Sequence, residues 1–117
     1  MISSVLKTLS DNDVGSSNSH QAGFLIPKEF VKNGGHYLGI CMGAYRAGER
    51  YFDILDGVNA VQYIKRPNAD IKRSYGTVAS VTWNDVKEDM YFYDGCALIG
   101  DETKFKTVAR YANGDPM

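Results

Sequence analysis

The sequence predicts a mixed α/β domain, and two patterns carry this prediction. The apolar residues 37–41 form a short run that leads directly into a segment with helical character. Three later runs, residues 77–83, 90–93 and 107–111, are rich in β-branched or aromatic residues and precede Asn, Asp or Gly turn signals. We therefore expect one early strand–helix unit followed mainly by strands, within the single domain that 117 residues allow.

The composition is that of an ordinary globular protein, with 44% hydrophobic and 23% charged residues. The formal net charge of −1 gives no reason to expect DNA or an anionic membrane as a partner. No apolar run approaches the roughly 20 residues that cross a bilayer, and the start lacks a secretory signal pattern. Cys41 and Cys96 fit neither a metal site nor a disulfide framework. We expect a cytoplasmic protein without metal, cofactor or membrane association.

The sequence of the N-terminal part predicts a polar loop followed by a short helix. Residues 5–9 can form a short extended piece, whereas residues 10–23 are almost entirely polar or glycine, which favours turns. Pro27 marks the predicted helix start, because a proline at the first helical position gives up no hydrogen bond. Residues 28–33 supply one or two turns, and Gly34 suits a left-handed cap.

The segment around Cys41 has the Gly-x-Cys-x-Gly spacing of a nucleophile elbow, formed with Gly39 and Gly43. Such an elbow joins a strand to a helix, raises one side chain out of the sheet, and lets a backbone N–H approach the reacting atom. Cys41 is therefore the candidate nucleophile, with Gly39, Met42 and Gly43 as the elbow backbone. The helix N-terminus would favour a thiolate there. The alternative is a structural cysteine in an elbow that has no chemistry.

Six motifs that follow one another along the chain extend this interpretation. They are FVKNGG (30–35), YLGICMGAY (37–45), YFD (51–53), TVASVTW (77–83), MYFYDG (90–95) and VARYANG (108–114). From about residue 30 to the end, the chain thereby resembles the N-terminal domain of biotin-protein ligases, which belongs with the class I glutamine amidotransferase-like proteins. The resemblance implies a partial flavodoxin-like parallel sheet with flanking helices. It places Cys41 at the nucleophile position, with Tyr45 and Asp94 lining the site.

The catalytic partners that the resemblance calls for are missing from the sequence. In active members a His/Glu pair handles protons, and it follows the last strand, where this chain reaches Met117. His20 and His36 both precede the cysteine, and His36 is about 16 Å from Cys41 along an extended strand. Residues 29–117 are therefore expected to form a truncated amidotransferase-like domain that is catalytically incomplete.

The same resemblance leaves a sheet without its first strand–helix units, since the segment before Phe30 does not match them. Such a sheet exposes a bare edge and uncovered apolar faces. We expect these to be covered by dimerisation, or by a replacement strand from residues 5–26.

Residues 1–28 are expected to be a segment of different origin that contains the Ser/Asn-rich loop. Residues 6–15, 19–23 and 26–28 resemble the opening of the DNA-binding domain of EcoRII-like restriction endonucleases. In that family this stretch is an arm of a β-pseudobarrel that helps to contact DNA. The resemblance implies His20 and Gln21 as DNA-contacting residues, and the alternative is a pair of solvated loop residues.

Two further features receive structural interpretations. Cys96 follows a turn and has no partner motif, so we expect it to pack in the core. A basic cluster in the predicted connection 64–76 is interspersed with acid and is interpreted as a solvated loop; its members are Lys65, Arg66, Lys72 and Arg73.

The predicted function is binding or regulatory contact with a protein partner or a second copy of the chain. One alternative is a cysteine-dependent amidohydrolase that uses Cys41 on a small-molecule amide, with its base supplied by another chain. The other alternative is a DNA-binding remnant that acts through residues 5–28.

Overall fold

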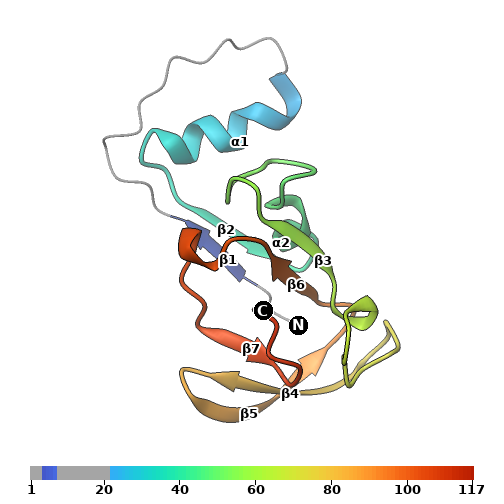
Figure 1. Ribbon diagram of the computed structural model, residues 1–117. Helices are drawn as coiled ribbons and strands as arrows, with labels where there is room; N and C mark the ends of the chain where they lie inside the picture. Colours follow the sequence, from blue (N-terminus) through green and yellow to red (C-terminus); the bar gives the residue numbers. More distant parts are fainter. Residues whose placement is uncertain (1–3, 8–21) are drawn as a thin grey trace.

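The computed structural model describes residues 4–7 and 22–117, which form three small antiparallel sheets and two helices (Figure 1). The strands are β1 (Ser4–Lys7), β2 (Tyr37–Ile40), β3 (Asn59–Gln62), β4 (Thr77–Trp83), β5 (Val86–Phe92), β6 (Cys96–Ile99) and β7 (Ala109–Tyr111). The helices are α1 (Ala22–Lys32) and α2 (Met42–Arg46), with 3-10 turns η1 (Tyr63–Lys65) and η2 (Glu102–Lys104). β1 pairs with β2, β3 pairs with β6, and the third sheet has the order β5-β4-β7. The predicted α/β class is confirmed.

The flavodoxin-like parallel arrangement is not confirmed, because every strand pair that the structure describes is antiparallel. β2 pairs with β1 in a register that runs from Ser4↔Ile40 to Lys7↔Tyr37. A strand from the N-terminal segment therefore covers one edge of β2, as the expected replacement strand would. An apolar run indicates a strand, but it does not determine the strand's neighbour or direction.

Only one face of β2 is covered. Gly39 is buried and Tyr37 partly buried, whereas the side chains of Leu38 and Ile40 are 62% and 49% exposed. Strand side chains alternate between two faces, so a two-stranded ribbon with a core on one side leaves its other side open. The apolar run 37–41 therefore contributes a strand that is buried on one face only and pairs antiparallel.

α1 begins at Ala22, five residues before the predicted start, and Pro27 lies inside the helix. Pro27 is the sixth residue of α1, beyond the first turn, so it removes one backbone hydrogen bond of the helix. The predicted end is confirmed. Gly34 has φ 95°, and the N–H groups of Gly34 and Gly35 donate to the carbonyls of Val31 and Phe30. These two bonds form a Schellman cap that requires the left-handed glycine.

Two hydrophobic cores lie on opposite faces of the β3–β6 ribbon. The first contains Val31, Ala44, Ala47, Ile54, Leu55, Val58, Cys96 and Leu98. The second contains Tyr63, Ala69, Ile71, Ala79, Val81, Phe92, Ala97 and Tyr111. Successive residues of β6 alternate between the cores, as the period of a strand requires. Cys96 is 1% exposed in the first core, so its predicted packing role is confirmed.

The second core is built around stacked aromatic rings. The rings of Tyr63 and Tyr111 are 3.8 Å apart and nearly parallel, and Phe92 meets each of them edge to face. Ala69 and Ile71 from the predicted exposed connection 64–76 also pack here, so that segment is not wholly a solvated loop. Polar residues on both sides of these two side chains concealed their burial in the sequence.

β4 has the predicted bounds and forms a tight hairpin with β5. Asn84 and Asp85 both have positive φ, 47° and 67°, between the paired residues Trp83 and Val86. Two such residues form the type I′ turn that suits the twist of a hairpin. The hairpin extends β5 to Val86, before the predicted start at residue 90, because its charged first half carries no apolar signal.

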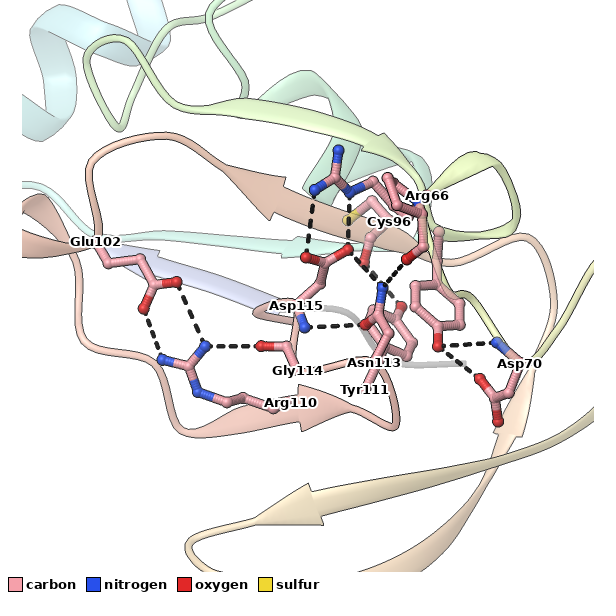
Figure 2. Close-up of polar contacts among 11 residues, drawn as sticks. Arg66, Asp70, Cys96, Glu102, Arg110, Tyr111, Asn113, Gly114 and Asp115 are labelled. Carbon is pink, nitrogen blue, oxygen red and sulfur yellow. Dashed lines mark hydrogen bonds and ion pairs between the residues drawn. The ribbon is translucent and has the colours of Figure 1, made fainter.

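A polar network holds the C-terminal loop against the second core (Figure 2). Arg66 donates two hydrogen bonds to the Asp115 carboxylate, of which the shorter is 2.7 Å. Asn113 donates to the Pro67 carbonyl at 3.0 Å and to Asp115 at 2.8 Å. The Arg66 hydrogen bond holds the pKa of Asp115 below its usual range. Burial and the hydrogen bond to Asp70 raise the pKa of Tyr63 to about 12.

Candidate functional site

Cys41 lies at the sharp turn between the end of β2 and the start of α2. Its backbone has φ 54° and ψ −112°, a combination that non-glycine residues rarely adopt. Such a conformation costs on the order of 1–3 kcal/mol and persists only where the surrounding structure imposes it. The predicted strand–turn–helix geometry is therefore present, although the strand belongs to an antiparallel ribbon.

Close packing between β2 and α2 holds this turn in place. A Cβ atom on Gly39 would lie 2.6 Å from the Gly43 carbonyl oxygen and 2.9 Å from the Ala44 nitrogen, so only glycine fits. The Tyr37 hydroxyl donates a 2.6 Å hydrogen bond to the Gly43 carbonyl, which ties the strand to the first turn of the helix. Burial raises the pKa of Tyr37, which keeps its hydroxyl a donor.

The Cys41 side chain is exposed, and it makes no capping hydrogen bond to α2. Its carbonyl instead accepts from the N–H groups of Ala44 and Tyr45, at 3.0 and 3.3 Å. Met42, the third predicted elbow residue, is 60% exposed beside it. Leu38 and Ile40 of β2 are exposed as well, so three exposed apolar residues lie within three positions of Cys41 along the chain, and we call these four residues the elbow patch.

The two predicted site-lining residues are brought together by a direct hydrogen bond. The Tyr45 hydroxyl donates to the Asp94 backbone carbonyl at 2.9 Å. The Gln62 amide donates to both carboxylate oxygens of Asp94, at 2.9 and 3.0 Å. Burial, and then the nearby Asp94 charge, raise the pKa of Tyr45, so this hydroxyl stays protonated. Gln62 had no signal in the sequence that could have linked it to Asp94.

His36, the one histidine among the described residues, does not lie beside Cys41 and cannot act as its general base. His36 is exposed and immediately precedes β2, at the opposite end of the strand from Cys41. An extended strand of this length separates them by about 16 Å. His20 and Gln21, the predicted DNA-contacting pair, lie outside the described residues.

Two of the four residues in the basic cluster have structural partners. Of the basic cluster, Arg66 is paired with Asp115, and Arg73 lies 5.0 Å over the ring of Tyr75. Lys65 and Lys72 are exposed. Within residues 4–7 and 22–117, no group of three or more His, Cys, Asp or Glu side chains is placed to hold a metal ion.

A small pocket lies between the loop after α2 and β3. Its volume is about 40 Å³, and its lining includes Tyr45, Arg50, Tyr51, Asn59 and Ala60. A space of this size holds only a few water molecules. The pocket is therefore too small to be the binding site of an amide substrate.

Comparisons with models of known families, with curated proteins and with solved structures gave no match. None of the helices in the described part of the chain is long and apolar enough to cross a membrane.

Proposed function

We propose that this chain is a binding or regulatory domain that uses the Cys41 elbow as a contact surface and does not turn over an amide. It would be a catalytically incomplete relative of the amidotransferase-like N-terminal domains of biotin-protein ligases. The observation that carries the proposal is the elbow patch, where an exposed Cys41 in a strained conformation lies within three positions of three exposed apolar residues along the chain. Exposed apolar patches mark contact surfaces in soluble proteins.

The surroundings of Cys41 also argue against turnover. A cysteine nucleophile needs a base within hydrogen-bond reach and donors for the oxyanion. Loss of one oxyanion donor alone lowers turnover by about 100- to 1,000-fold. His36 lies at the far end of β2, and the Asp94 carboxylate is held by Gln62. Neither residue is arranged to take a proton from the Cys41 thiol.

Two alkylating reagents test the contact surface without a known partner. N-phenylmaleimide carries an apolar ring, whereas N-ethylmaleimide carries a small group. The measured quantity is the rate of labelling by N-phenylmaleimide divided by the rate of labelling by N-ethylmaleimide. If the elbow patch binds the phenyl ring, this ratio should be higher for Cys41 than for glutathione. Ile40→Ser should return the ratio to that of glutathione, and Val78→Ser, a change at an exposed position on another sheet, should leave it raised. The glutathione ratio in the unsubstituted protein would contradict a binding role for this patch.

The strained backbone at Cys41 favours one alternative, a cysteine-dependent amidohydrolase whose base comes from another chain. Strained residues cluster at functional sites, where the strain is part of the mechanism. Ammonia release from glutamine, measured with the protein and with Cys41→Ala, separates the two functions. Equal rates support the binding role, whereas ammonia release that depends on Cys41 would establish the enzyme.

A further inference from the structure

The three-stranded sheet has one closed edge and one open edge. At the β7 edge, the Ala109 carbonyl accepts from Met117, the Tyr111 N–H donates to Asp115, and Arg110 forms a bridge with Pro116. The opposite edge is β5, which pairs with β4 alone among the described residues. β5 extends over seven residues and lies at the end of the molecule opposite α1 (Figure 1).

The hairpin turn determines which backbone groups of β5 face outward. In a two-residue type I′ hairpin, Trp83 and Val86 form a hydrogen-bonded pair, and such pairs alternate along the ladder. Lys87, Asp89 and Tyr91 therefore direct their N–H and C=O groups away from β4. An extended peptide can add to β5 through these three residues.

The side chains of β5 present two consecutive acidic residues at this edge, next to the exposed Lys87. Glu88 and Asp89 are exposed, and neither takes part in an ion pair of the described residues. Because they are consecutive in a strand, their carboxylates lie on opposite faces of the sheet. Tyr91 and its cross-strand neighbour Val78 are 58% and 61% exposed on the same face as Asp89.

The charge pattern also disfavours a second copy of this strand as the occupant. When two β5 strands pair antiparallel about their centre, Asp89 of one strand lies opposite Asp89 of the other. Like charges directly opposite each other destabilise a strand pair. Charged residues at an edge are the usual protection against such self-pairing.

We propose that the β5 edge binds an extended segment of a protein partner that carries two consecutive basic residues. The partner strand adds antiparallel to β5, and its two cations lie on opposite faces against Glu88 and Asp89. An apolar residue two positions before the first cation packs on Tyr91 and Val78. This site does not include the Cys41 elbow, so a test of peptide binding at β5 is independent of the tests of the proposed function.

The probe is a fluorescein-labelled peptide, Thr-Val-Thr-Arg-Arg-Thr-Val, and its control has Glu-Glu in place of Arg-Arg. Fluorescence anisotropy at low ionic strength should show the arginine peptide binding at least about tenfold more tightly than the glutamate peptide. Asp89→Lys should lower the affinity for the arginine peptide by about tenfold, since one attraction becomes a repulsion. Glu49→Lys makes the same change of net charge at an exposed position away from β5, and it should leave the affinity nearly unchanged.

A backbone substitution tests strand addition itself. Asp89→Pro removes an outward N–H together with the carboxylate and leaves the β4 ladder intact, so it should bind the arginine peptide more weakly than Asp89→Asn, which removes the charge alone, while circular dichroism stays unchanged. Equal affinity for the two peptides would overturn the proposal, and so would binding by a folded Asp89→Pro variant as tight as that by Asp89→Asn. A dimer of the free protein that dissociates in Asp89→Pro would show instead that a second copy occupies this edge.

Discussion

Gly39→Ala should destabilise the protein markedly, because the added methyl group meets backbone atoms that cannot rotate away. The new Cβ would lie 2.6 Å from the Gly43 oxygen, 2.7 Å from the Gly43 carbonyl carbon and 2.9 Å from the Ala44 nitrogen. Relief requires the first turn of α2 to move away from β2, which breaks the packing that fixes the Cys41 turn. Overpacking of this kind costs about 1–3 kcal/mol, and we expect the upper part of that range.

Gly43→Ala is the matched control, since its Cβ would approach nothing nearer than the Tyr37 hydroxyl at 3.5 Å. Gly43 lies in α2, so alanine there should be neutral or stabilise by up to about 1 kcal/mol. Urea unfolding followed by circular dichroism measures both changes in the free energy of unfolding. Equal midpoints for Gly39→Ala and the unsubstituted protein would refute the packing of β2 against α2.

Three further changes have expected outcomes. Asp115→Asn should cost about 1 kcal/mol at neutral pH by removing the Arg66 ion pair. The pKa of Asp115 is lowered in the folded protein, so its contribution to the free energy of unfolding is present above the usual aspartate pKa and is lost as the pH falls through the lowered value. Urea unfolding should therefore show the stabilities of the Asp115→Asn variant and the unsubstituted protein converging in acid. Asp85→Gly should stabilise the β4–β5 turn by about 0.5–1 kcal/mol, read from the thermal midpoint, and a lower midpoint would contradict the type I′ turn. Tyr45→Phe should cost about 1 kcal/mol by removing the bond to the Asp94 carbonyl, and ultraviolet titration should show one tyrosine fewer among those that resist ionisation near pH 10.

Local elements could be predicted from the sequence because their signals are local. The β-branched run of β4 and the Gly34 cap lie where propensity and turn chemistry place them. A replacement strand from residues 5–26 was one of two expected covers for the sheet edge, but its antiparallel register on β2 could not be predicted, since the two segments are separated by α1 and their pairing depends on tertiary packing. The start of α1 was missed because Pro27 indicates a first helical turn, although a helix can also include a proline shortly after its beginning.

The candidate site was predictable to the same extent. The spacing of Gly39, Cys41 and Gly43 was sufficient to predict the turn, and the close approach of β2 and α2 excludes a larger side chain at Gly39. The contact between Tyr45 and Asp94 joins residues far apart in the sequence, and only the structure shows it as a hydrogen bond. The hydrogen bond from the Gln62 amide to the Asp94 carboxylate could not be predicted, because no sequence motif links these two residues.

Alkylation of the native protein with iodoacetamide at neutral pH, followed by mass spectrometry of the two cysteine peptides, tests the central claim most directly. Cys41 is exposed and Cys96 is 1% exposed in the core, so each cysteine is a control for the other. We predict that Cys41 is modified at about the rate of a model thiol while Cys96 stays unmodified until the protein unfolds. Equal labelling of both cysteines would contradict the fold around the elbow, and a Cys41 rate far above that of the model thiol would contradict the non-catalytic role.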